Sequence, residues 1–473
     1  MMILKSISFL LSLSLANALS LDVGDKDSVC DAATLIVDGM MDYYEGNRYG
    51  GTVGMFQAPY YWWEAGEAMG GLIDTWFFCK NDTYESLISQ ALLAQIGSDK
   101  DYMPSNQTAT EGNDDQAFWG LAVLQAAERN FTNPSGDDSD ISWIGLAQAV
   151  YNTMWSRWDS ANCGGGLRWQ IFTWNAGYDY KNTISNAGLF NIAARIARYT
   201  SNNTYAETAE TVYDWLRDVG YVSLSDDGTY YTVYDGAKIG TNNCSTFSET
   251  QYSYNYALLL GGAAYMYNYT ENETWSTEVG RLYEGISRTF LNNSIMFEYM
   301  CEKSTSCNND QRSFKSVFSR MMGLTAKLVP DYHDKILDIL DTSANGAAQS
   351  CSGGSDGHTC GRNWAYGGWD GWYGLGEQMS ALEVIQNTLI DSADGPYYYY
   401  TGHPMNSSDS SSDDSSSRGG ASSSIDNNAG LSGDSESLNA NSITVKRKDR
   451  VGAGIVTAIV LAVLIGLSVW MLL

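Results

Sequence analysis

Two adjacent acids, Asp114 and Asp115, stand out in the stretch EGNDDQAFWG at 111–120. They lie between a Gly-Asn pair and a run of aromatic and small residues. Acids in the first turn of a helix commonly cap it and complement the positive end of its dipole. Two carboxyl groups held close together also supply the acid and the nucleophile or base that glycoside cleavage requires. The two residues alone leave both interpretations open, and the cap is the commoner one.

As a reaction centre, the pair would favour one stereochemical outcome. Neighbouring positions on a helix diverge by about 100°, which suits the carboxyl separation of about 5–5.5 Å in retaining glycosidases better than the wider separation in inverting ones. The helix dipole favours an ionised acid, and repulsion between like charges raises the pKa of its neighbour. The two acids would therefore differ in proton state, although their spacing does not assign the roles.

The elements that position these acids are predicted to be helices. About twelve segments of the chain have helical apolar spacing, and one insertion at 221–236 reads as a β-hairpin with an Asp-Gly turn. Every second segment is rich in Gly and Ala and opens with polar and aromatic groups, which indicates an inner ring of closely packed helices. We therefore predict an all-α fold, an (α/α)6 barrel or toroid. An open α-solenoid is the alternative, and it would need capping repeats.

In such a toroid the inner helices all begin at one end, so their first residues gather at one mouth. Asp114 and Asp115 would lie there among aromatic and amide side chains, a lining suited to a neutral polyol. The other residues expected at the mouth are Tyr60, Tyr61, Trp62, Trp63, Trp174, Asn175, Lys181, Asn182, Tyr252, Tyr254 and Trp369. Six of these are predicted to bind the sugar: Trp62, Trp63, Trp174, Asn182, Tyr254 and Trp369.

The charge and composition restrict the ligand class. A net charge of −28 and a pI near 4.3 argue against nucleic acid and against anionic ligands, because the field of the protein repels both. The 32 Tyr, 15 Trp and 13 Phe suit a groove that stacks on sugar rings, although we expect most of them in the core. The three histidines, at 333, 358 and 403, give no zinc pattern, and no CxxC occurs. We predict no metal and no cofactor.

The eight cysteines are expected to form up to four disulfides in an oxidising compartment. Cys301–Cys307 and Cys351–Cys360 are the plausible local pairs, and the other four cysteines are not assigned.

Residues 1–18 carry a lysine, an apolar run and an A-x-A site, the pattern of a secretory signal peptide. The catalytic domain is then expected over 19–401.

The C-terminal part predicts a membrane attachment. Residues 402–450 are dominated by Ser, Asp, Asn and Gly, and we expect a disordered stalk. An apolar tail follows at 451–473, and small residues upstream include the attachment-site candidates Asn428 and Asn439. This order is typical of a GPI signal, whose tail is removed from the mature protein. A true transmembrane anchor is the alternative, since the tail is long enough to span a bilayer.

Glycosylation sequons support the secreted assignment. Nine N-x-[ST] sites occur, at Asn81, Asn106, Asn130, Asn202, Asn243, Asn268, Asn272, Asn292 and Asn406.

Several motifs together resemble glycoside hydrolase family 76. They are PYYWWEAGEAMGGLIDTW, GNDDQAFWGLA, YKNTISNAG and FKSVFSRMM, spread over most of 21–400. Among its members the chain is most similar to the fungal GPI-anchored mannan endo-1,6-α-mannosidases of cell-wall biogenesis. The resemblance implies an (α/α)6 fold, retaining action on α-1,6-mannan, Asp114 as the nucleophile and Asp115 as the general acid/base. It also implies that Asp235 and Arg320 bind sugar, although Asp235 would serve equally as a turn cap and Arg320 as the partner of an inner-ring acid.

The predicted function is therefore that of an endo-α-1,6-mannosidase or transglycosidase, a monomer at the outer face of the plasma membrane or in the cell wall. Its substrate would be α-1,6-mannan or a GPI-core glycan, with glucan as the acceptor in the transfer reaction. Nothing in the residues separates transfer from hydrolysis. Two non-enzymatic alternatives stay open: a mannan-binding wall protein in which the acids are only caps, and an adhesin in which the stalk carries the function.

Overall fold

The computed structural model describes residues 18–398, 425–431 and 457. All of these except residue 457 belong to one compact unit that ends at Leu431. The predicted apolar tail, all but one residue of the predicted signal peptide, and most of the predicted stalk lie outside the described residues. None of the described helices is long and apolar enough to cross a bilayer.

The described part of the chain contains twelve α-helices in two sets, as predicted. The inner set consists of α2 (Trp62–Cys79), α4 (Asn113–Glu128), α6 (Thr183–Thr200), α8 (Ser253–Thr270), α10 (Asn309–Leu328) and α12 (Leu375–Gln386). The outer set consists of α1 (Lys26–Met41), α3 (Glu85–Ala94), α5 (Trp143–Ser156), α7 (Asn203–Asp218), α9 (Glu273–Thr289) and α11 (His333–Ser350). Short 3-10 turns lie at Gly136–Asp138, Pro330–Tyr332 and Asn387–Ile390.

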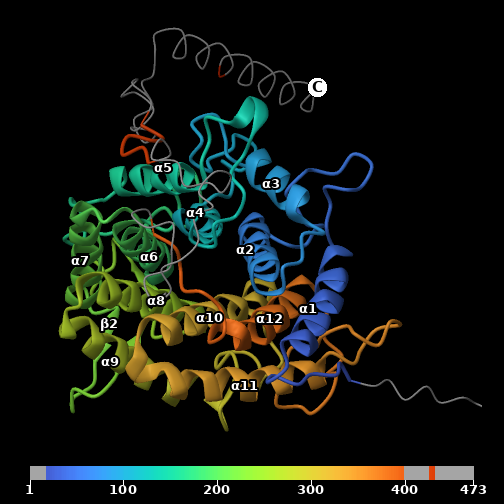
Figure 1. Cartoon of the computed structure of the whole chain (residues 1–473). Coiled ribbons are helices and arrows are strands. Elements are labelled where there is room, and N and C mark those ends of the chain that lie inside the picture. Colours follow the sequence, from blue (N-terminus) through green and yellow to red (C-terminus); the bar gives the residue numbers. More distant parts are fainter. Residues whose placement is uncertain (1–17, 399–424, 432–456, 458–473) are drawn as a thin grey trace, which may run out of the picture. The chain divides into compact units, whose positions relative to one another are not determined.

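The inner helices form a closed ring. Each packs against the next along the chain, and α12 packs against α2, so that no inner face is left uncovered (Figure 1). The outer helices surround this ring. The (α/α)6 barrel is therefore confirmed, and an open solenoid is excluded.

Small residues permit the close approach of the inner helices. A Cβ atom on Gly66 of α2 would lie 3.1 Å from the Trp119 ring of α4. A Cβ atom on Gly262 of α8 would lie only 2.4 Å from the Phe190 ring of α6. Larger side chains at these two positions would push neighbouring helices apart, which is why the inner segments are rich in Gly and Ala.

Among the described residues, three short antiparallel strand pairs lie in the connections between helices. The predicted hairpin is confirmed as β2 (Val222–Leu224) paired with β3 (Tyr231–Val233). The pairing of β1 (Tyr180–Asn182) with β4 (Gly236–Lys238) was not predicted, nor was that of β5 (Leu291–Asn292) with β6 (Ile295–Met296). The β1–β4 pair sets Asn182 opposite Gly236, so it brings Asp235 to the beginning of α6.

Four disulfides stabilise the unit. The two predicted local pairs, Cys301–Cys307 and Cys351–Cys360, are confirmed. Cys30–Cys79 joins α1 to the end of α2, and Cys163–Cys244 joins two loops 81 residues apart.

A buried cluster of charges crosses the interior of the ring. The Arg320 guanidinium of α10 lies 2.7 Å from a carboxylate oxygen of Glu67 on α2 and 2.7 Å from one of Glu383 on α12. Its Nε also lies 3.6 Å from Asp74, which accepts a 2.8 Å hydrogen bond from Arg129, the residue that follows α4. All five side chains are buried. One cation thus ties α2, α10 and α12 together, and Asp74 extends the cluster to α4.

A second buried pair extends these links to the remaining inner helices. Arg195 of α6 lies 2.8 Å from Glu128 of α4, and the Tyr265 hydroxyl of α8 donates a 2.6 Å hydrogen bond to Glu128. Burial raises the pKa of Glu383 to about 8. The Arg320 guanidinium opposes this shift, because it stabilises the ionised form of Glu383.

Residues 425–431 lie within the segment expected to be a disordered stalk, yet they pack on the outer ring. The Gln148 amide of α5 accepts a hydrogen bond from the Asp426 backbone N–H, and it donates one to the Asn427 side chain. Asn152 of α5 donates to the backbone carbonyls of Asn427 and Ala429. These backbone bonds offset the low apolar content from which disorder was expected.

We predict that Arg320→Ala strongly destabilises the fold. Removing the guanidinium leaves Glu67 and Glu383 buried without a counter-charge, and losses of this kind cost about 3–5 kcal/mol. Urea unfolding followed by circular dichroism measures the effect. The matched control is Arg288→Ala, whose partner Glu284 is about half exposed on the surface of α9, and it should change stability by less than about 0.5 kcal/mol. Equal effects of the two variants would show that the buried cluster does not stabilise the ring.

Candidate active site

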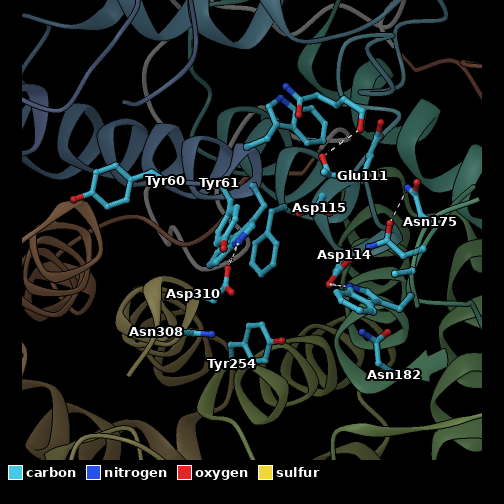
Figure 2. A pocket seen from close by; sticks show the side chains of 18 of the residues that line it. Tyr60, Tyr61, Glu111, Asp114, Asp115, Asn175, Asn182, Tyr254, Asn308 and Asp310 are labelled. Carbon is cyan, nitrogen blue, oxygen red and sulfur yellow. Dashed lines mark hydrogen bonds between the residues drawn. The ribbon is translucent and has the colours of Figure 1, made fainter. Parts of the chain in front are cut away.

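A pocket of about 710 Å³ opens where the inner helices begin. Its wall includes residues at the first turns of α2, α4, α8 and α10, and Asn182 immediately before α6 (Figure 2). The backbone N–H groups of a first turn have no partners within their helix, so these helix ends favour negative charge in the pocket. None of the described residues that line it is Lys, Arg or His.

Asp114 and Asp115 both line this pocket, but their hydrogen bonds differ. The Asp115 carboxylate accepts a 2.6 Å hydrogen bond from the Gly112 backbone N–H and so caps α4. The Asp114 carboxylate does not bond this N–H but accepts a 2.9 Å hydrogen bond from the Trp169 indole. Asp115 is therefore a helix cap and a pocket residue at once, whereas capping does not explain Asp114.

The backbone around Trp169 explains why its indole reaches Asp114. The Asn113 N–H donates a 2.8 Å hydrogen bond to the Trp169 carbonyl, which fixes this loop against the start of α4. Gly177, with φ of +99°, lies beneath the indole ring, and a Cβ atom there would come within 2.4 Å of it. Any larger residue at 177 would displace the indole from Asp114.

Burial raises the pKa of both acids. For Asp114 the shift is well above the usual range, with repulsion from Asp115 adding to burial and the Trp169 bond opposing it. Burial raises the pKa of Asp115 to about 7, the Gly112 N–H opposes this shift, and repulsion from Asp310 adds to it. Groups coupled in this way lose their protons in two steps that belong to the pair. Between those steps the pair holds one proton, so one member is an acid while the other is a carboxylate.

Two further acids that we did not predict line the pocket. Asp310, the second residue of α10, accepts a 2.9 Å hydrogen bond from the Trp63 indole, and it lies across the ring from Asp114 (Figure 2). Glu111 precedes α4 and is buried with neither carboxylate oxygen hydrogen-bonded to another protein group, and burial raises its pKa well above the usual range. The sequence does contain a signal for Asp310, because NNDQ at 308–311 repeats the pattern of NDDQ at 113–116.

Five of the predicted sugar-binding residues line the pocket: Trp62, Trp63, Asn182, Asp235 and Tyr254. Asp235 accepts a 2.6 Å hydrogen bond from the Tyr180 hydroxyl, while its carbonyl accepts one from the Thr183 N–H. Asn182 is also the N-cap of α6. The Tyr254 ring stacks on Phe314, with 3.7 Å between ring centroids. These contacts fix the polar and aromatic walls before any ligand enters.

The other three predictions need correction. Arg320 lies in the buried charge cluster, which is the acid-paired alternative that the sequence left open, and its guanidinium does not reach the pocket. Trp174 is 58% exposed and stacks on Phe172 outside the lining residues. Trp369 lies in an exposed loop before α12 and is not a lining residue either. Lys181, also expected at the mouth, is buried and donates to the backbone carbonyls of residues 159, 162 and 165.

The remaining site predictions concern modification and metals. None of the eight described sequon asparagines is buried, and Asn428 is exposed. Asn406 and Asn439 lie outside the described residues. Within the part of the chain that the structure describes, no group of three or more His, Cys, Asp or Glu side chains is placed to hold a metal ion.

Comparison with known proteins gives matches along most of the chain. The family model described as Glycosyl hydrolase family 76 matches residues 28–399. The mannan endo-1,6-alpha-mannosidase DFG5 of Saccharomyces cerevisiae is 53% identical over 466 residues, which cover 98% of this chain and 96% of that protein. The protein of the same name in Candida albicans is 49% identical and covers 96% of this chain and 95% of its own length.

Two solved structures are similar as well. Dfg5 from Chaetomium thermophilum, in complex with glucosamine, has a TM-score of 0.76 and 42% identity, and the match covers 80% of this chain and 95% of that one. An inactive variant of a Salegentibacter α-1,6-mannanase, in which two adjacent aspartates are replaced by asparagine, is solved with α-1,6-mannotriose. It has a TM-score of 0.61 and 15% identity over 76% of this chain and 99% of that one, which shows a common fold.

We predict that Asp115→Asn stabilises the protein at alkaline pH. An acid whose pKa rises on folding binds more protons when folded, so its ionisation costs stability as pH rises between the unfolded pKa, about 4, and the folded pKa, about 7. Asparagine avoids this cost and keeps an oxygen that accepts the Gly112 N–H bond. The variant should melt a few degrees above the wild type at pH 8 and equally with it below pH 4.

Differential scanning calorimetry across this pH range measures the effect. Asp226→Asn, in the exposed hairpin turn, is the control and should change the melting temperature little. A variant of Asp115 that is less stable than the wild type at pH 8 would contradict the electrostatic cost assigned to this carboxyl.

Proposed function

Because this chain belongs to glycosyl hydrolase family 76, we propose that its pocket cleaves α-1,6-linked mannose chains internally, with Asp114 and Asp115 as the reacting groups. The observation that carries the proposal is the acidic pair itself. Its two carboxyl groups are adjacent, share one pocket and have different hydrogen-bond partners. Two adjacent aspartates are also the residues replaced in the inactive Salegentibacter variant. The aromatic walls and the lack of cations in the lining suit a neutral sugar.

In the proposed mechanism Asp114 is the nucleophile. Its carboxylate attacks the anomeric carbon of the mannose on the donor side and displaces the O6 oxygen of the next sugar. Trp169 orients this carboxylate, and its N–H stabilises the charged form before attack. The product of this step is a covalent glycosyl ester on Asp114.

Asp115 is the acid/base residue in this scheme. It protonates the leaving oxygen in the first step, and as a carboxylate it removes a proton from the incoming hydroxyl in the second. A pKa of about 7 suits both steps, because the group must exchange its proton in each cycle. Two inversions at the same carbon give retention of configuration.

The second step decides between hydrolysis and transfer. Water on the glycosyl ester gives hydrolysis, whereas a sugar hydroxyl gives a new glycosidic bond. We propose that the donor is α-1,6-mannan or the mannose part of a GPI-core glycan, and that a wall glucan is the acceptor in transfer. Glucosamine bound to the Chaetomium thermophilum protein supports the GPI-core glycan as a donor, since that glycan contains this amino sugar.

We also propose that the mature protein is a secreted monomer, attached through GPI to the outer face of the plasma membrane or to the cell wall. The four disulfides support an oxidising compartment, and the sequons accessible on the folded unit support glycosylation. The net charge of −28 disfavours nucleic acid as a partner.

We predict that Asp114→Asn and Asp115→Asn each lower activity on α-1,6-mannan by at least about a thousandfold while leaving the fold intact. Each variant removes one of the two groups that the bond cleavage needs. Chromatography of released oligosaccharides measures activity, and proton NMR of the first products should show the α-anomer. The control is Asp226→Asn, which should retain wild-type activity.

These variants also test the mannan-binding alternative, in which both acids only cap a helix. That alternative requires both variants to support the wild-type cellular function, and such a result would overturn the enzymatic proposal. An initial β-anomer would instead show an inverting reaction and would remove the nucleophile role from Asp114.

The pH dependence of kcat/KM tests the two roles separately. Activity should fall on the alkaline side of neutrality, because the coupled pair then loses the proton that Asp115 must donate. In Trp169→Phe the acidic limb should move to higher pH, because the lost N–H bond normally lowers the pKa of Asp114, which must be ionised to attack. A profile unchanged in Trp169→Phe would show that this indole does not act on the nucleophile.

A further inference from the structure

Resting on the proposed function, we propose a second glycan-binding site on the loop Asn363–Tyr373, here called the aromatic loop. It would bind the stretch of the α-1,6-linked mannose chain that extends out of the pocket. The sequence of this loop, NWAYGGWDGWY, contains five aromatic residues among eleven. Three of them are presented to solvent.

The exposed rings of the aromatic loop are unusual for a folded surface. Tyr366 is 65% exposed, Tyr373 60% and Trp369 37%, and all three lie within eight residues. Single exposed aromatic residues are common on proteins, but a group of them indicates a surface that binds a ligand or another macromolecule. Flat aromatic faces pack against the C–H faces of sugar rings, so a neutral glycan is the ligand class that they fit.

The other two aromatic residues of the loop serve a structural role. The guanidinium groups of Arg312 and Arg362 lie 5.6 and 4.6 Å from the centre of the Trp372 ring. Trp364 is buried, with the Lys315 ammonium 3.9 Å from its ring. These cation–π contacts hold the base of the loop, and only the remaining three rings are left for a ligand.

Hydrogen bonds also fix the conformation of the loop. The Asp370 carboxylate accepts from the backbone N–H groups of Arg362, Asn363 and Trp372. The Trp369 indole donates a 2.7 Å hydrogen bond to the Trp372 carbonyl, and its ring lies on Gly353, where a Cβ atom would come within 2.4 Å. A loop held in this way loses little conformational entropy when it binds a chain.

The aromatic loop adjoins the pocket wall at Tyr60. Tyr60 lines the pocket, and its hydroxyl accepts a 3.0 Å hydrogen bond from the Leu375 N–H, two residues after the loop. Figure 2 shows the Tyr60 ring directed away from Asp114 and Asp115. The next residue, Tyr61, lines the pocket and is 53% exposed. Aromatic side chains therefore lead from the reaction centre to the loop, and we assign both surfaces to one glycan chain.

A double variant, Tyr366→Ala with Tyr373→Ala, tests this site. Both side chains are exposed, so their removal should not disturb folding. Affinity electrophoresis in gels containing α-1,6-mannan should show roughly tenfold weaker binding, because two aromatic contacts are lost. Activity on a short oligosaccharide that fills only the pocket should stay at the wild-type level.

Two matched variants complete the test. Tyr366→Phe with Tyr373→Phe keeps the rings and should bind mannan like the wild type. Tyr49→Ala removes a fully exposed tyrosine from another loop and should also have no effect. Wild-type binding by the alanine double variant, or weaker binding to β-glucan but not to mannan, would overturn the assignment.

Failure of the proposed function gives a different result, since the wild-type protein itself would then neither bind nor cleave mannan. If it cleaves mannan while the alanine double variant binds the polymer normally, only the second site is refuted.

Discussion

The closed ring depends on charges buried in its interior. Six helices arranged in a ring leave a centre that short apolar side chains do not cross, whereas the long side chains of Arg320 and Arg195 reach carboxylates on neighbouring helices. Burying such charges is costly, and the cost is recovered only when partners are placed accurately. The cluster therefore demands a specific helix arrangement, and it closes the ring beneath the pocket. Apolar contacts alone would allow the inner helices to slide along one another, whereas these ion pairs fix their relative positions.

The chemistry at the pocket follows from that arrangement. Because the ring fixes the inner helices, their first turns meet at one end and present unpaired N–H groups and dipoles to the same space. Acids placed there are attracted by the dipoles and repelled by each other. Burial raises the pKa of Asp115 from near 4 to about 7, and repulsion from Asp310 adds to this shift. Burial and repulsion of these two carboxyl groups lower the stability of the fold. They also give the pair a proton that can be exchanged near neutral pH.

Periodicity predicted the two rings because helical spacing repeats over many residues. It also predicted that Asp114 and Asp115 lie at the start of an inner helix, because the residues that begin a helix can be recognised from the local sequence. Periodicity gives the face of a helix on which Arg320 lies but not its depth along that helix. Arg320 lies ten positions beyond Asp310 on α10, and at 1.5 Å per residue this is about 15 Å farther from the mouth. The loops carrying Trp174 and Trp369 have no period, so their placement could not be predicted.

The docking of residues 425–431 determines where mechanical load enters the protein. Tension on the chain beyond Leu431 reaches first the hydrogen bonds that Gln148 and Asn152 make with this segment. Both residues belong to α5, an outer helix that packs against α4 and α6. The load is thus received by the outer wall and shared between two inner helices. A protein held by its C-terminal end would therefore be pulled on the outer ring, at α5.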